Sequence, residues 1–121
     1  MEIRFTSPVV YTNDSAKIIA QMEKLGFHVN HEKEITGDND VTTTTMKDDA
    51  GHPMAVVENA RFTTPFSGIR LIVDNLCEAL DKLTAVGYMN LQAGSTNTGT
   101  SYATLLRSPE GIFVSITEHT K

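Results

Sequence analysis

The chain has 121 residues, of which 40% are hydrophobic and 21% charged, and its formal net charge is −5. A chain of this length buries about two-thirds of its unfolded surface, so its core needs no metal or disulfide. Its one cysteine excludes an internal disulfide framework, and its acidic balance argues against nucleic acid, which is bound through Lys and Arg.

The first half of the chain predicts a strand, a helix and three further strands. The helix begins at the capping residues Asn13–Ser15 and ends at Gly26. Apolar residues recur at helical spacing between these two ends, and strand-forming residues dominate the other segments. The expected strands cover residues 2–11, 27–35, 41–47 and 53–58, with turns at 36–40 and 48–51.

The second half repeats this order. Asn75 is the expected cap of a second helix, and Gly87 ends it. The expected strands cover residues 68–73, 88–91, 101–107 and 112–118, with a loop at 93–100 and a turn at 108–111.

The two halves align as an internal repeat. A shift of about 61 residues places Gly26 on Gly87, and a shift of about 60 places Gly51 on Gly111. We therefore predict one domain over residues 1–121, built from two tandem βαβββ modules. Module one covers about residues 1–59, a connection about 60–67, and module two about 68–121.

This duplicated layout resembles the vicinal oxygen chelate superfamily, which includes glyoxalase I, bleomycin-resistance proteins, fosfomycin-resistance enzymes and extradiol dioxygenases. The resemblance covers nearly the whole chain. It rests on residues 9–14 and 24–27, on the matching residues 69–75 and 83–88, and on the closing turn and strand at 108–116. It implies an α+β fold in which a curved, mostly antiparallel sheet forms a cup with the helices outside.

In the metal-dependent members of that family, each module supplies one ligand from its first strand and one from its last. Carried over to this sequence, the four positions fall on Ser7, Ala55, Gly68 and Ser115. None of these residues is a good ligand for a catalytic transition metal. We therefore expect no metal, no cofactor and no assigned catalytic residue, and the sequence argues against an enzyme.

Strand alternation predicts which residues line the implied cup. Arg70 shares strand parity with Gly68, and its guanidinium suits a ligand carboxylate or phosphate; the structural alternative is an arginine that reaches the rim or pairs with a carboxylate. The other candidates combine aromatic walls with small polar residues, and plain core packing is their alternative explanation. The full set of candidate ligand-binding residues is Arg70, Tyr11, Phe113, Ser7, Ser115, Phe62 and Phe66.

Acidic residues concentrate in the first half, where residues 1–60 carry five basic and ten acidic side chains, a sum of −5. Solvated turns explain such a cluster, and a surface that attracts cationic ligands is the alternative. The cluster comprises Glu32, Glu34, Asp38, Asp40, Asp48 and Asp49. The four histidines lack the spacing of a metal site.

These observations favour a metal-independent protein that sequesters or carries an unidentified small organic molecule. One alternative is a metal-dependent lyase, isomerase or dioxygenase with ligands at other positions. Another is a protein with a closed cup that acts through its surface. The resemblance also implies a homodimer.

No apolar run approaches the roughly 20 residues of a membrane helix. The first eight residues show no secretory signal pattern. We therefore expect a cytoplasmic protein that contacts neither membrane nor nucleic acid.

Overall fold

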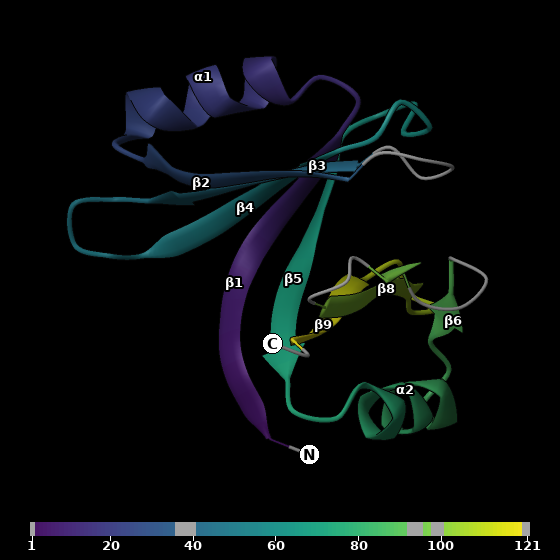
Figure 1. Ribbon diagram of the computed structural model, residues 1–121. Helices are drawn as coiled ribbons and strands as arrows, with labels where there is room; N and C mark the ends of the chain where they lie inside the picture. Colours follow the sequence, from purple (N-terminus) through teal and green to yellow (C-terminus); the bar gives the residue numbers. More distant parts are fainter. Residues whose placement is uncertain (1, 36–40, 92–95, 98–100, 120–121) are drawn as a thin grey trace. The chain divides into compact units, whose positions relative to one another are not determined.

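The computed structural model describes residues 2–35, 41–91, 96–97 and 101–119 (Figure 1). The chain divides into two compact units. The first unit is Ser7–Ser67, and the second unit is Gly68–Lys121 together with Met1–Thr6. Within the described residues, no helix is long and apolar enough to cross a membrane.

The first unit contains one helix and four strands, in the predicted order. Its strands lie in the order β2-β3-β4-β1. Strand β3 pairs antiparallel with both β2 and β4, whereas β1 pairs parallel with β4. The elements are β1 (Ile3–Thr12), α1 (Ser15–Leu25), β2 (His28–Ile35), β3 (Val41–Lys47) and β4 (Pro53–Glu58).

The second unit repeats this arrangement, with the strand order β5-β9-β8-β6 and β7 paired to β8. Strands β5 and β9 are parallel, and β8 is antiparallel to β9, β6 and β7. The start of β1 belongs to this unit, where Glu2 N donates to Asp74 Oδ1 at 2.7 Å. The elements are β5 (Phe66–Val73), α2 (Leu76–Ala85), β6 (Met89–Asn90), β7 (Thr96–Asn97), β8 (Ser101–Arg107) and β9 (Phe113–His119).

The α+β class and the two βαβββ modules are thus confirmed, and most of the strand pairs are antiparallel. The ends of the predicted strands lie within one residue of the observed ends, with two larger differences. Strand β5 begins at Phe66, inside the expected connection, and aromatic residues favour the extended backbone of a strand. Residues 96–97 of the expected loop form β7, which pairs with residues 102–103 of β8. The rest of that loop and the predicted turn at 36–40 lie outside the described residues.

The N-termini of both helices are capped by the same two kinds of hydrogen bond. The side chain of Asp14 accepts from Lys17 N at 3.3 Å, and that of Asn75 accepts from Glu78 N at 3.0 Å. These contacts satisfy amides that the first turn leaves without a helical partner.

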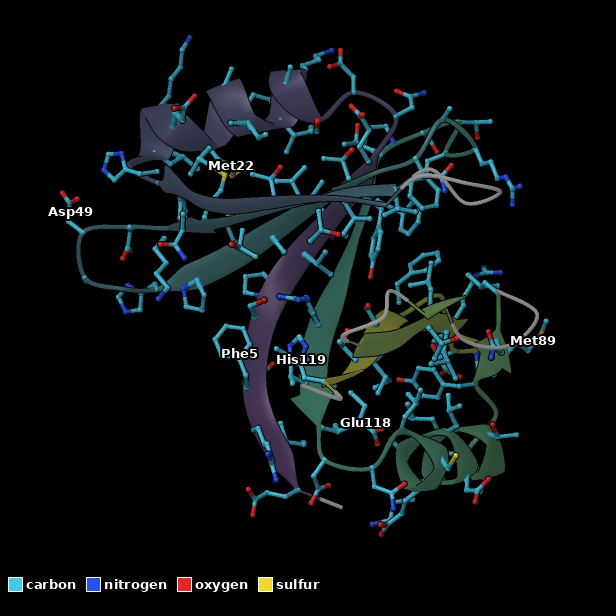
Figure 2. The ribbon with its side chains drawn as sticks, viewed as in Figure 1. Phe5, Met22, Asp49, Met89, Glu118 and His119 are labelled. Atoms are coloured by element: carbon cyan, nitrogen blue, oxygen red, sulfur yellow. The ribbon has the colours of Figure 1, made fainter. Side chains whose placement is uncertain are left out.

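The second capping hydrogen bond is accepted by a glutamate from the last strand of the same module. Glu58 Oε1 accepts from Ser15 N at 2.8 Å in the first unit, and Glu118 Oε1 accepts from Leu76 N at 2.9 Å in the second. Figure 2 shows Glu118 directed toward the start of α2. Each carboxylate also lies where the helix dipole favours negative charge.

The β3–β4 and β8–β9 turns are also equivalent. Gly51 N donates to Asp48 O at 3.0 Å, and Gly111 N donates to Ser108 O at 3.0 Å. Gly51 and Gly111 have φ of 87° and 93°, a region that favours glycine. The repeat predicted from sequence is therefore confirmed at the level of individual backbone contacts.

Each helix buries one face of the strands in its own unit. Residues of α1 pack with Met46, Met54 and Val56, and Figure 2 shows Met22 on the strand side of α1. Residues of α2 pack with Val73, Leu106, Val114 and Ile116. Strand alternation then places the intervening residues on the opposite faces, which we call the α1-distal and α2-distal faces.

Candidate functional site

The α1-distal face carries two of the predicted ligand-binding residues from β1. Val10 packs toward α1, so Ser7, Val9 and Tyr11 point the other way. Val9 lies beside Ala55 in the parallel β1–β4 register. These four residues, Ser7, Val9, Tyr11 and Ala55, are buried, with exposed fractions of 4% or less.

Tyr11 forms a three-ring cluster with Phe62 and Phe66. The rings of Tyr11 and Phe66 stack with centroids 4.8 Å apart. Phe62 meets Tyr11 and Phe66 edge-on, at centroid distances of 5.7 and 5.1 Å. Such pairs contribute about 0.5–1.5 kcal/mol each beyond their buried area. The structure therefore brings together three of the candidates, and their binding of a ligand stays a prediction.

Ser7 has a buried hydroxyl. Among the described residues, its Oγ has no hydrogen-bond partner. Leaving such a group unpaired costs about 1–3 kcal/mol. A hydroxyl in this state is ready to accept or donate a hydrogen bond to a small molecule.

The α2-distal face carries the other three candidates. Leu71 and Val73 pack toward the α2 core, so Gly68 and Arg70 of β5 point away from it. In the parallel register, Gly68 lies beside Phe113, and Arg70 lies beside Ser115. Arg70, Phe113 and Ser115 are each partly buried. The strand parity predicted for these residues is therefore present in the second unit.

Gly68 is constrained by the backbone beside it. A Cβ at this position would lie 2.9 Å from Phe113 Cβ and 3.0 Å from its carbonyl carbon. Its φ is not in the left-handed region, so space, not backbone conformation, is what favours glycine here.

The four positions that correspond to the family's metal ligands do not fit a metal. Ala55 has no donor atom, and Gly68 has neither a side chain nor room for one. Ser7 and Ser115 offer only neutral hydroxyls, which are weak ligands for a transition metal. Elsewhere in the described part of the chain, no group of three His, Cys, Asp or Glu side chains is arranged to hold a metal ion.

Arg107 was not among the predicted site residues, and the structure places it beside Phe113. These residues face each other across the β8–β9 pair, and Arg107 Cζ lies 6.0 Å from the centroid of the Phe113 ring. Arg107 and Phe113 each lie three residues from Glu110 in the turn, and this equal spacing was the available signal, because residues on either side of a hairpin turn pair on one face.

Two residues of the acidic cluster, Asp48 and Asp49, have described side chains, and both lie at the β3–β4 turn. Asp48 accepts from Ala50 N at 3.0 Å, His52 N at 2.8 Å and His52 Nδ1 at 2.8 Å. The hydrogen bond from the His52 side chain is the main cause that lowers the pKa of Asp48, and backbone hydrogen bonds add to it. Asp49, at the tip of the β3–β4 hairpin in Figure 2, lies 3.1 Å from His28 Nε2.

These contacts favour the solvated-turn interpretation for Asp48 and Asp49. The remaining acidic residues of the cluster have side chains outside the described set: Glu32, Glu34, Asp38 and Asp40.

No model of a known protein family matches the chain, and no curated protein matches it. Solved structures do. Methylmalonyl-CoA epimerase from Mycobacterium tuberculosis matches with a TM-score of 0.69 at 12% identity, over 98% of this chain and 90% of that one. A methylmalonyl-CoA epimerase from Streptomyces coelicolor matches with a TM-score of 0.64 at 12% identity, over 99% of this chain and all of that one.

A hypothetical protein from Bacillus halodurans C-125 also matches, with a TM-score of 0.69 at 9% identity, over all of this chain and 97% of that one. The epimerases belong to the vicinal oxygen chelate superfamily. At these identities the likeness shows the fold alone, and the fold of this chain is the vicinal oxygen chelate fold.

Proposed function

We propose that the chain is a vicinal oxygen chelate superfamily protein that binds a small organic molecule without a metal, and so sequesters or carries it. The supporting observation is the chemistry of the four ligand positions. One lacks a donor atom, and another is closed by the neighbouring backbone. Apolar enclosure with one or two polar anchors is the usual basis for such binding.

Each distal face carries its own set of candidate ligand-binding residues. The rings of Tyr11, Phe62 and Phe66, together with the Ser7 hydroxyl, form the candidate set in the first unit. Arg70, Phe113 and Ser115 form the set in the second. We also propose that the protein is cytoplasmic and that it forms a homodimer. The proposal of a homodimer rests on the family resemblance alone.

An isomerase is the second candidate, because two of the similar structures are named methylmalonyl-CoA epimerases. A metal-dependent form of that function requires ligands other than Ser7, Ala55, Gly68 and Ser115. Incubation with methylmalonyl-CoA in deuterated water measures this activity directly, as exchange of the proton next to the thioester. Exchange above the rate without protein moves the isomerase to first place.

A metal titration tests the main proposal. Chelator-treated protein is mixed in turn with Zn, Ni, Mn, Fe(II) and Co while its melting temperature and bound metal are measured. A ligand at 100 times its Kd stabilises the folded state by about 2.7 kcal/mol, which raises the melting temperature of a domain of this size by roughly 10 °C. We expect no such rise and no stoichiometric metal.

The His28→Ala/His52→Ala variant is the control for surface binding, because both histidines are exposed and each contacts an aspartate of the β3–β4 turn. Metal that is lost in this variant belongs to the surface. One metal per chain that survives in the variant, with clear stabilisation, overturns the proposal.

A further inference from the structure

The α2-distal face carries two arginines on neighbouring rows. Arg70 lies beside Ser115, which pairs with Leu105 of β8. One row away, Gly68 lies beside Phe113, which pairs with Arg107. From a strand spacing of about 4.8 Å and a rise of about 3.3 Å per residue, the two arginine Cα atoms lie about 12 Å apart. Two long side chains at that separation can approach one small molecule from opposite ends.

The Phe113 ring gives Arg107 a defined position. The guanidinium lies 6.0 Å from the ring centroid, a distance at which the ring attracts a cation. The N–H groups that bind a carboxylate in pairs lie along the edge of the planar guanidinium. An arginine held in this way loses less side-chain entropy when it binds an anion.

The first unit shows that the turn does not need this pair. Its equivalent positions are Lys47 and Pro53, which face each other across β3 and β4. The turn there keeps the same backbone hydrogen bonds, with Asp48 N to His52 O at 3.1 Å against Ser108 N to Ile112 O at 2.9 Å. The repeat thus separates the role of the turn from the presence of an arginine on a ring.

The other positions show the same difference. Val9 takes the place of Arg70 in the first unit, since Val9 lies beside Ala55 as Arg70 lies beside Ser115. The two guanidiniums and the ring are therefore a feature of the second unit. Among the described side chains that alternation places on its α2-distal face, none is a carboxylate.

We infer that the α2-distal face binds a small organic acid with a planar apolar body, its carboxylate held by Arg107 and its body close to Phe113, with Arg70 as the second polar anchor. This inference rests on the proposed function and names its ligand class. In the sequence, the acidic first half suits a cationic ligand and Arg70 suits an anionic one. The inferred site favours the anionic ligand.

Amide-resolved NMR titrations of the full chain, with chelator present, test this inference. The probes are benzoate and 2-naphthoate, with benzamide as the neutral match of benzoate, benzylamine as the cation, and inorganic phosphate as an anion without an apolar body. We expect the two carboxylates to bind more tightly than the other three probes. Their largest shifts should fall at Leu105, Phe113 and Ser115, and 2-naphthoate should bind more tightly than benzoate.

The variants assign the contacts. Arg107→Gln removes the charge but keeps most of the stem, and we expect it to weaken 2-naphthoate binding by about tenfold, the usual scale of a charge-assisted hydrogen bond. Arg70→Ala should weaken binding less. Lys82→Ala is the matched control, because it removes one positive charge from the exposed surface of α2 in the same unit; its affinity should stay within about twofold of the original protein.

Three outcomes overturn the inference: equal binding of benzoate and benzamide, unchanged affinity in Arg107→Gln, or shifts that centre on α2 instead of β8 and β9. Melting temperatures of every variant show whether a loss reflects unfolding, and Arg107→Lys is the second test where Arg107→Gln unfolds. Because chelator is present, the carboxylate titrations measure binding without metal, and their result is independent of the metal titration. Failure of the carboxylate probes leaves the metal result unchanged, and a tightly held metal leaves the carboxylate site to be judged by the variants.

Discussion

Replacing Gly68 with alanine should destabilise the protein measurably. The new Cβ would meet Phe113 Cβ at 2.9 Å and the Phe113 carbonyl carbon at 3.0 Å, and the carbonyl oxygen would be closer still. Two of these three atoms are backbone, so a side-chain rotation cannot relieve the contact. Overpacking of this kind costs about 1–3 kcal/mol.

An opposing effect reduces that cost. Alanine restricts the unfolded chain more than glycine does, which returns about 0.4–1 kcal/mol where the backbone tolerates the change. Gly68 has no left-handed φ, so this gain applies. The net loss of unfolding free energy is then about 1–2 kcal/mol, or roughly 3–10 °C in melting temperature.

Thermal and urea unfolding of Gly68→Ala and of Ser7→Ala form the assay. Ser7 occupies the equivalent position in the first unit and already carries a Cβ. Removing its buried hydroxyl, which has no partner among the described residues, should leave stability unchanged or raise it by up to about 1 kcal/mol. Equal stability of Gly68→Ala and the original protein would refute the close approach of Phe113, and with it the argument that this metal-ligand position is closed.

Three further predictions concern the helix ends and one turn. Glu58→Ala and Glu118→Ala should each lower the free energy of unfolding by about 1 kcal/mol, because each removes an acceptor from a helix N-terminus; Glu110→Ala, on the exposed β8–β9 turn, is the control, and urea unfolding measures the difference. Gly87→Ala should cost more than Gly26→Ala, since both glycines have φ above 100° but a Cβ at Gly87 also lies 3.2 Å from Pro109; equal melting temperatures would contradict this. The pKa of Asp48 is lowered from 3.8 by its His52 hydrogen bond, so its stabilisation is present above that value and is lost as the pH falls through the lower folded pKa. Asp48→Asn should therefore melt earlier at pH 7 and lose less stability than the original protein between pH 5 and about pH 2; the same acid dependence in both proteins would contradict this.

Local signals explain why most of the fold was predictable. Asn75 caps its helix through an amide three residues away, and Gly26 and Gly87 end helices where a left-handed residue is needed. Strand alternation then assigned Arg70 to the correct face of β5. Such features depend on neighbours in sequence and can be read from one chain.

Long-range contacts explain what was missed. The acceptor at the start of α1 is 43 residues away at Glu58, and that of α2 is 42 residues away at Glu118. Nothing in their local sequence distinguishes these two glutamates from the other acidic residues of the chain. Strand β7 was not predicted because Thr96–Asn97 has no apolar pattern, and it forms a strand by pairing with β8. Arg107 was overlooked because its importance arises from the strand register that brings it to Phe113.

The division of β1 between the two units bears on how the chain folds during synthesis. The first unit is continuous in sequence, so all of its residues leave the ribosome together. Residues 2–6 leave before the first unit but belong with the second, and the Glu2 backbone forms its hydrogen bonds only once Asp74 has been made. At about 5–20 residues per second, the second unit is completed roughly 3–11 s after the first. Until Asp74 follows, the Glu2 backbone lacks the partner that it has in the folded unit, so a fusion or truncation at residues 2–6 acts on the second unit and not on the first.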